Sequence, residues 1–298
     1  MKNSYPSFII KIFYFIRYIS FCLWPKFTIE FEFKRLVGYK LHIKNPVTYN
    51  EKIQYLMLYW YDPLATICAD KYLVRDYVKE RGLGFLLNDL YGVYDNADDI
   101  DINNLPNEFV LKVNHGCGLN LICNDKNNLN WESEKKKINK WMKKSHYYDS
   151  LEWVYKDIKP KIIIEKLIKT KDNESLNDYK VLCFNGEPRS IMVISDRGTE
   201  TMKVDFFDTD WNHINVIFYG LQNSMLQRPK ELDEILEYSK ILSKGFPHMR
   251  VDFYIVDGRV IFGECTFFPA GGKVSFEPID YDYELGRYFD ITNLLNKN

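Results

Sequence analysis

The sequence lacks the patterns that would place it in several functional classes. Lys and Arg together number 40 against 41 Asp and Glu, so a formal net charge of -1 provides no general positive field for nucleic acid. The six cysteines are scattered without a Cys-x-x-Cys pair, so neither a zinc knuckle nor a disulfide framework is indicated. The five histidines lack the i, i+4 spacing of a zincin helix. We therefore expect a cytoplasmic protein that does not bind nucleic acid.

Long uncharged apolar runs are also absent. The most apolar stretch, from Phe8 to Trp24, contains Lys11 and Arg17 and is followed by Pro25, which argues against a full membrane crossing. No small-residue cleavage site follows, which argues against a secretory signal. We expect residues 1–26 to form a short apolar helix that docks on the protein's own body. The alternative is peripheral contact of residues 8–24 with the inner face of the membrane.

The chain is long and apolar enough to bury a large core. It has 298 residues, of which 46% are hydrophobic and 16% aromatic. Helix-like and strand-like segments alternate from residue 46 onward, as they do in mixed α/β proteins. We predict helices over Tyr49–Tyr61, ended by Asp62-Pro63, and over Ala69–Arg81, and a strand over Gly84–Tyr94.

A β-hairpin is predicted in the segment from Met249 to Gly272. Two β-rich runs, Val251–Ile255 and Val260–Cys265, flank Asp257-Gly258, which is a strong hairpin signal. Side chains alternate between the two faces of a strand, so the charged residues of these runs would share one face.

The charged face of this hairpin carries two carboxylates and an arginine. With a three-residue turn, Asp252 would lie opposite Glu264, and Arg250 opposite Thr266. Two carboxylates held together need a positive partner. Hard oxygen ligands of this kind suit Mg²⁺, which completes its shell with waters and substrate phosphates. A plain amphipathic hairpin with charges on its wet face is the alternative.

A glycine-containing loop joins two other predicted strands. Phe109–Val113 leads into Asn114–Asn120, and a second strand follows at Leu121–Cys123. Glycines would let backbone N–H groups close over a phosphate, although the loop is neither a P-loop nor a Rossmann fingerprint. With Lys112 before it, the loop suits a flap over a nucleotide. An ordinary hairpin loop is the alternative.

Two further strands are predicted in the middle of the chain. Pro160–Ile168 reads as a short buried strand whose exit could pair with an adenine through its backbone, or as a plain core strand. Asp178–Phe184 alternates and ends at the turn Asn185-Gly186. Lys180 on this strand could reach a carboxylate or a phosphate, although an exposed lysine is the default expectation.

Four segments taken in order resemble the nucleotide motifs of an ATP-grasp enzyme: Asp70-Lys71, FVLKVNHGCGLN, KIIIEKLI and RVDFYIVDGRVIFGECTFFPAGG. More narrowly, the chain is similar to the TupA-like ATP-grasp family, which is named for a teichuronopeptide biosynthesis protein and is often found among polysaccharide genes. The likeness covers roughly residues 30–290. It implies a mixed α+β fold in which two subdomains, about 84–165 (the lid) and about 166–290 (the metal-binding subdomain), close on a nucleotide. The whole ATP-grasp domain would span residues 27–290, with a tail over 291–298.

The resemblance also implies roles for individual residues. ATP phosphates would contact Lys71 and Lys112 and would be covered by a loop containing His115, Gly116, Cys117, Gly118 and Asn120. Lys180 is a further candidate for binding the nucleotide. The adenine and ribose would be held by Glu165, Lys166, Leu167 and Ile168. Mg²⁺, or Mn²⁺ in its place, would be ligated by Asp252, Glu264 and Thr266. Many ATP-grasp enzymes have an asparagine at the position of Thr266, so this chain departs from the pattern there. The catalytic residues would be Arg250 and Lys112.

The activity implied by the resemblance is an ATP-dependent carboxylate–amine ligase that works through an acyl phosphate. Its partners would be a small-molecule or glycan carboxylate and an amine, and its setting the amidation of a sugar acid, or amino-acid transfer, in surface polysaccharide biosynthesis. One alternative is a glycosyltransferase, for which Asp208-Thr209-Asp210 offers an Asp-x-Asp pair. A second alternative is a non-catalytic ATP-binding assembly factor.

Overall fold

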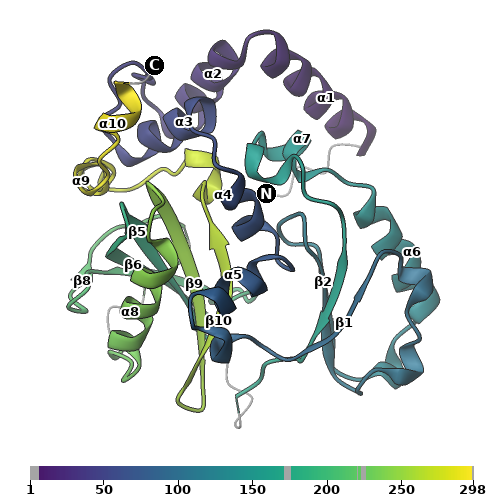
Figure 1. The fold of residues 1–298 in the computed structure, drawn as a ribbon. Coiled ribbons are helices and arrows are strands. Elements are labelled where there is room, and N and C mark those ends of the chain that lie inside the picture. Colours follow the sequence, from purple (N-terminus) through teal and green to yellow (C-terminus); the bar gives the residue numbers. More distant parts are fainter. Residues whose placement is uncertain (1–6, 171–175, 220, 223–225, 297–298) are drawn as a thin grey trace.

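Two antiparallel sheets lie side by side in the computed structural model, which describes residues 7–170, 176–219, 221–222 and 226–296 (Figure 1). The small sheet has the strand order β1-β4-β2-β3, formed by Leu90–Tyr94, Ile162–Glu165, Phe109–Val113 and Asn120–Cys123. The large sheet has the order β10-β9-β5-β6-β7-β8, formed by Arg259–Thr266, His248–Val256, Asp178–Phe184, Glu187–Ser195, Lys203–Phe207 and His213–Ile214. The mixed α+β class expected from the sequence is confirmed, and the two sheets divide the chain between Glu165 and Asp178.

Helices surround both sheets. The α-helices are α1 Ser7–Leu23, α2 Pro25–Val37, α3 Tyr49–Tyr59, α4 Pro63–Ala69, α5 Val74–Glu80, α6 Trp131–Met142, α7 His146–Ser150, α8 Leu232–Ser243, α9 Asp280–Tyr288 and α10 Thr292–Leu295. Short 3-10 helices are η1 Gly84–Leu86, η2 Ala97–Asp99, η3 Ile102–Asn104, η4 Lys126–Asn128, η5 Trp153–Tyr155 and η6 Pro269–Gly272. In Figure 1, α6 covers the outer side of the small sheet and α8 lies against the large one.

Each sheet has its own apolar core. In the small sheet, Leu111 and Ile164 pack with Ile138 of α6, and all three side chains are fully buried. The larger core joins the large sheet to α3, α4, α5 and α9 and includes buried aromatic side chains such as Phe184 and Phe253. Because each sheet packs its own core, the space between the two sheets belongs to neither core. A cavity can therefore lie there.

The β9–β10 hairpin has the pairing expected for its charged residues, but for a different reason. Its turn is the two-residue Asp257-Gly258, with φ of 50° and 76°, and not a three-residue turn. The pairing then shifts by one residue between Phe262 and Glu264, at Gly263. This β-bulge places Glu264 opposite Asp252, on the same face of the sheet. The carbonyl oxygen of Asp252 would lie 2.9 Å from a Cβ atom at residue 263, so the close approach requires glycine.

The helices before the first strand begin and end differently from the sequence prediction. Thr48 and Glu51 form a capping box, so α3 begins at Tyr49 as expected. However, α3 ends at Tyr59, two residues before the predicted end at Tyr61. Asp62-Pro63 begins α4, because the carboxylate of Asp62 accepts the Leu64 N–H and proline occupies the first turn. The predicted helix over Ala69–Arg81 is therefore wrong at its start.

The actual break falls at Asp70. Its carboxylate accepts hydrogen bonds from the N–H groups of Tyr72 and Leu73, so the chain turns before α5 begins at Val74. The predicted strand over Gly84–Tyr94 is also shorter than expected, since its first part forms η1 and β1 begins at Leu90.

The N-terminal segment forms two helices. In Figure 1, α1 and α2 make an arch along the top of the molecule, away from both sheets. Tyr18 and Phe21 of α1 pack against the large core, and the Tyr18 ring meets that of Tyr148 in α7. Over the part of the chain that the structure describes, no helix is both long enough and apolar enough to cross a membrane.

Candidate functional site

A cavity of about 910 Å³ lies between the two sheets. Side chains from β2, β3 and β4 line one wall, and side chains from β5, β9 and β10 line the other. Its charged lining residues are Lys71, Lys112, Lys169, Lys180 and Arg197, together with Glu165, Asp178, Asp252 and Glu264. The lining thus has one more cationic side chain than carboxylates. The cations can bind an anionic ligand, and the carboxylates can bind a metal ion that accompanies it.

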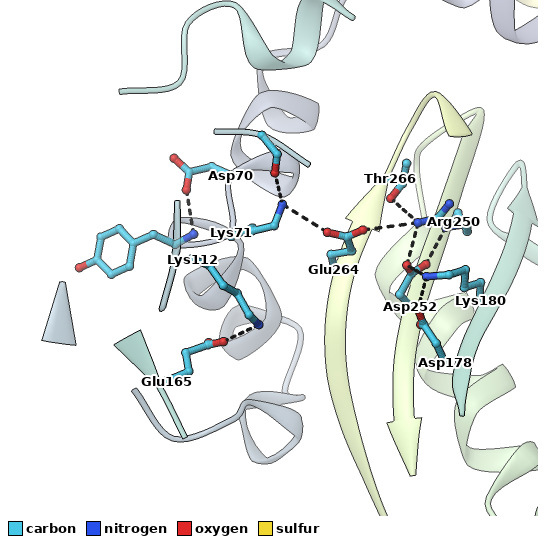
Figure 2. A network of polar contacts seen from close by, with 12 residues as sticks. Asp70, Lys71, Lys112, Glu165, Asp178, Lys180, Arg250, Asp252, Glu264 and Thr266 are labelled. Carbon is cyan, nitrogen blue, oxygen red and sulfur yellow. Dashed lines mark hydrogen bonds and ion pairs between the residues drawn. The ribbon is translucent and has the colours of Figure 1, made fainter. Parts of the chain in front are cut away.

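Lys71 connects the two walls. It lies in the turn between α4 and α5, and its Nζ donates a 2.8 Å hydrogen bond to the carbonyl oxygen of Gly116 in the glycine loop. The same Nζ lies 3.3 Å from Oε2 of Glu264 on β10. Figure 2 shows these two side chains pointing toward each other between the two walls.

Glu264 is held in its charged form by its neighbours. Burial alone would raise the pKa of its carboxyl group, but Lys71, Arg250 and Lys180 outweigh that effect and lower the pKa to about 2. The carboxylate is therefore ionised at any physiological pH. About a third of the side chain is exposed, so it is accessible from the cavity.

Asp252, on the adjacent strand β9, is buried beside two cations. Nε and Nη2 of Arg250 donate to its two carboxylate oxygens at 2.6 and 2.7 Å, and Lys180 of β5 also donates to Oδ2. Lys180 faces Asp252 because these two residues are directly paired between β5 and β9. Burial would lower the pKa of Arg250, but Asp252 and Glu264 raise it above its ordinary value.

Asp178 is a third carboxylate on this wall of the cavity, and the sequence analysis did not assign it to the site. The Nζ of Lys180 lies 2.7 Å from Oδ2 of Asp178, and Arg197, in the segment after β6, donates to the same oxygen at 2.6 Å. The other oxygen, Oδ1, is buried with no hydrogen-bond partner among the described residues. Burial raises the pKa of this carboxyl group. Asp178 and Lys180 are two residues apart on one strand, so side-chain alternation could have indicated their shared face.

The opposite wall has its own ion-pair cluster. Lys112 of β2 donates to Oε2 of Glu165 at the end of β4, at 2.9 Å. Arg75 of α5 donates to Oε1 of the same carboxylate, also at 2.9 Å. Arg75 is a second residue that the sequence analysis did not assign to the site, because the pairing depends on residues 90 positions apart in the chain.

The structure brings most of the predicted residues to the cavity. Those that line it are Lys71, Lys112, Gly116, Cys117, Gly118, Asn120, Glu165, Ile168, Lys180, Asp252 and Glu264. His115 is buried, and its Nε2 lies 3.0 Å from the Lys144 carbonyl oxygen. The backbone N–H of Lys166 donates to Asp89, and its carbonyl oxygen accepts from Asn88. His115, Lys166, Leu167, Arg250 and Thr266 do not line the cavity.

The hydroxyl group of Thr266 already has a partner. Nη2 of Arg250 donates to Oγ1 of Thr266 at 3.0 Å. The structure therefore places Thr266 beside the arginine, where it orients the guanidinium group. Its predicted role as a metal ligand stays a prediction.

The donor set fits a magnesium ion that shares its shell with phosphates. Among the residues that the structure describes, no three His, Cys, Asp or Glu side chains lie together as a complete metal cluster. Asp252 and Glu264 nevertheless face each other at the cavity wall. One or two carboxylates are the usual protein contribution to a Mg²⁺ site completed by water and substrate phosphates.

The Asp-x-Asp pair has a local structural role. The Oδ1 atom of Asp208 accepts hydrogen bonds from the N–H groups of Asp210 and Asn212, at 3.0 and 2.8 Å. Its Oδ2 accepts from the Asn212 side chain at 2.8 Å. These bonds stabilise the turn between β7 and β8, so no observation favours a metal at this pair.

Two antiparallel sheets that face a cavity, with a glycine loop on one wall and paired acids on the other, define an ATP-grasp fold. The family model described as TupA-like ATPgrasp matches residues 51–290. The chain therefore belongs to the TupA-like ATP-grasp family. A search of curated protein sequences gives no match.

The solved structures to which the chain is similar include those of three enzymes. D-alanine–D-alanine ligase from Bacillus anthracis, complexed with ATP, is 16% identical with a TM-score of 0.47, over 78% of this chain and 65% of that one. An ADP complex of N5-carboxyaminoimidazole ribonucleotide synthetase is 14% identical with a TM-score of 0.42, over 73% and 50%. L-amino acid ligase from Bacillus licheniformis is 15% identical with a TM-score of 0.39, over 69% and 41%. The chain thus spans 65% or less of the length of these enzymes.

Proposed function

We propose that the protein is an ATP-dependent ligase that joins a carboxylate to an amine. The observation that carries this proposal is the row of alternating charges across the cavity. Lys71 meets Glu264, Arg250 meets both Glu264 and Asp252, and Lys180 meets Asp252. Such a row can bind a polyphosphate and neutralise charge as a phosphoryl group is transferred.

Each group in the row would have a defined task. Asp252 and Glu264 would hold Mg²⁺, which when bound would neutralise charge on the phosphate oxygens. Lys71, from the turn between α4 and α5, and Lys112 of β2 would contact phosphate oxygens. Arg250 does not line the cavity itself, so its guanidinium group would stabilise the transferred phosphoryl group electrostatically from behind Asp252 and Glu264. The loop from Gly116 to Gly118 would cover the phosphates.

The proposed reaction needs no protein nucleophile. A substrate carboxylate oxygen would attack the γ-phosphorus of ATP, and the bond from that phosphorus to the oxygen of the departing ADP would break. The amine nitrogen would then attack the acyl carbon, phosphate would leave, and the nitrogen would lose a proton. The residues of the chain act by positioning and by charge neutralisation.

For the acceptor, we propose a sugar acid or a related glycan carboxylate of a surface polysaccharide. The support is the resemblance to a family named for a teichuronopeptide biosynthesis protein. The amine would be ammonia or an amino acid. The ligase chemistry does not depend on which carboxylate and which amine are the substrates.

One assay tests the ligase proposal directly. Purified protein is incubated with Mg-ATP, hydroxylamine and pooled candidate carboxylates, including sugar acids, and ADP and hydroxamate are followed together. Formation of both, dependent on a carboxylate, is the expected result. Release of a nucleoside diphosphate from a sugar nucleotide without ATP would instead identify a glycosyltransferase. Binding of ATP with no turnover in any pool would identify an assembly factor.

A further inference from the structure

The middle of α1, residues 12–16, is made up of apolar side chains that are all exposed. Five consecutive residues, Ile12, Phe13, Tyr14, Phe15 and Ile16, are each between 36% and 66% exposed. An α-helix completes a turn in 3.6 residues, so five in a row point in every direction around the axis. A helix that is hydrophobic all round belongs in a protein core or in a membrane. This part of α1 lies outside both cores of the protein.

α2 also has an exposed apolar face. Leu23 and Trp24, at the junction of the two helices, are exposed together with Phe27 and Phe31, whose stacked rings lie 6.4 Å apart. The opposite face of α2 is buried against the body of the protein through Ile29 and other side chains. The apolar arch of α1 and α2 thus has an inner side that is packed and an outer side that is not.

The arch is fixed to the rest of the molecule by a buried ion-pair cluster. Arg17 donates two hydrogen bonds to the carboxylate of Glu32 and a third, of 2.6 Å, to the carbonyl oxygen of Asp149. Lys273 donates to the same carboxylate at 2.6 Å. This cluster sets the direction in which the exposed end of α1 projects.

We propose that the apolar arch inserts into the interface of a lipid bilayer. A second protein copy would cover only one side of α1, whereas a fluid lipid surface can adapt to apolar side chains that point in several directions. Trp24 and Tyr14 are residue types enriched at the boundary between headgroups and acyl chains. Two exposed cations near the end of α2, Lys34 and Arg35, suit an anionic lipid surface, whereas Lys26 is paired with Glu30 at 4.0 Å. Since no helix among the described residues can cross a membrane, the contact would be peripheral.

Flotation of the full chain with vesicles tests this proposal without reference to the ligase activity. One vesicle type contains phosphatidylcholine alone, and the other contains one phosphatidylglycerol for every two phosphatidylcholines. We expect the protein to float with both, and more strongly with the anionic vesicles. The double variant Phe15→Ser/Ile16→Ser should lower the partition coefficient by at least about tenfold, because two apolar side chains lose their burial in lipid.

A matched variant controls for the loss of exposed apolar residues in general. Val47 and Phe85 are 55% and 62% exposed, against 66% and 61% for Phe15 and Ile16, but lie outside the arch. Val47→Ser/Phe85→Ser should therefore float like the wild type. Thermal unfolding midpoints establish that all three proteins are folded. Absence of flotation by the wild type, or equal losses in both variants, would overturn the proposal. A wild-type dimer that the Phe15/Ile16 variant cannot form, with no vesicle binding, would also overturn it and assign the arch to a protein interface.

Discussion

Nζ of Lys71 lies 3.3 Å from Oε2 of Glu264, although these residues belong to different parts of the molecule. Lys71 also donates to Gly116, so one side chain contacts both the glycine loop and the acidic wall. A single ammonium group thus bridges the two walls of the cavity, and the same group is suited to bind phosphate.

Replacing Lys71 should affect both walls. Lys71→Gln removes a cation that lowers the pKa of Glu264, so that pKa should rise toward its ordinary value. We expect ATP turnover to fall by about 100-fold, the usual effect of losing one preorganised charge-stabilising group. ADP release and NMR titration of Glu264 measure the two effects. Lys79→Gln, on the surface of α5 and paired with Asp76, is the control. Equal turnover in the two variants would contradict a role for Lys71.

The two proposed metal ligands should differ in their effects on stability. Both Asp252→Asn and Glu264→Gln should lower Mg-dependent ADP release by at least about 100-fold. Asp252→Asn should also destabilise the fold by about 3 kcal/mol, because Arg250 and Lys180 would lose their buried counter-charge. Glu264→Gln is the cleaner test, since that side chain is a third exposed.

Urea unfolding and ADP release separate these contributions. Asp210→Asn, in the exposed turn after β7, serves as the control and should retain full activity. Wild-type turnover in Glu264→Gln would remove the central assignment of the acidic wall. Loss of activity in Asp210→Asn alone would redirect attention to the Asp-x-Asp turn.

Disrupting the bulge at Gly263 should lower turnover by more than the loss of stability alone would explain. Gly263→Ala brings a Cβ atom to 2.9 Å from the Asp252 carbonyl oxygen, which should cost about 1–3 kcal/mol through overpacking. It should also displace Glu264 from Asp252 and lower turnover. Gly258→Ala is the comparison, because its positive φ of 76° makes alanine unfavourable without altering the bulge. If both variants lose stability and activity in proportion, the bulge has no separate role in catalysis.

Stability should decrease in acid partly because of His248. Burial lowers the pKa of His248 to about 3, while its ordinary value is 6.5. Between these values the unfolded chain binds a proton that the folded chain does not, so stability rises with pH. This one residue contributes a slope of about 1.4 kcal/mol per pH unit in that window, and its contribution is complete above pH ~6.5.

The slope is measured by urea unfolding at a series of pH values. His248→Gln removes the titrating group while retaining a donor for the Phe267 carbonyl oxygen, so the dependence between these pH values should become shallower. His42, whose side chain is 62% exposed, provides the control variant His42→Asn. An unchanged slope in His248→Gln would show that other groups dominate acid unfolding.

The strands and their faces could be predicted from the sequence because they depend on local patterns. Phe109–Val113 and Asp178–Phe184 have the bounds that alternation and β-rich composition predicted. The Asp62-Pro63 pair was harder to interpret, because the same residues that suggest the end of one helix form the start of the next. Asp70 was misplaced for a related reason: its carboxylate serves the backbone of a turn and not a continuing helix.

The partners of the site residues depended on tertiary structure. The sequence analysis brought Asp252 and Glu264 together, but through a turn of the wrong length that happened to give the same offset as the bulge. Arg75 and Arg197 could not be assigned to the site, since their carboxylate partners lie on strands that are distant in the fold or the sequence. Alternation along a strand identifies a shared face, whereas the approach of distant elements depends on how the whole core packs.

Arg17, Glu32 and Lys273 make the N-terminal helix part of the folded body. The Glu32 carboxylate is shared between a guanidinium group from α1 and an ammonium group from the segment after η6. A chain shortened to remove α1 would leave this buried carboxylate with one cation and the carbonyl oxygen of Asp149 without its donor. Truncation at this end would therefore change the charge balance in the interior as well as remove an apolar surface. Point substitutions at Phe15 and Ile16 change the apolar surface alone.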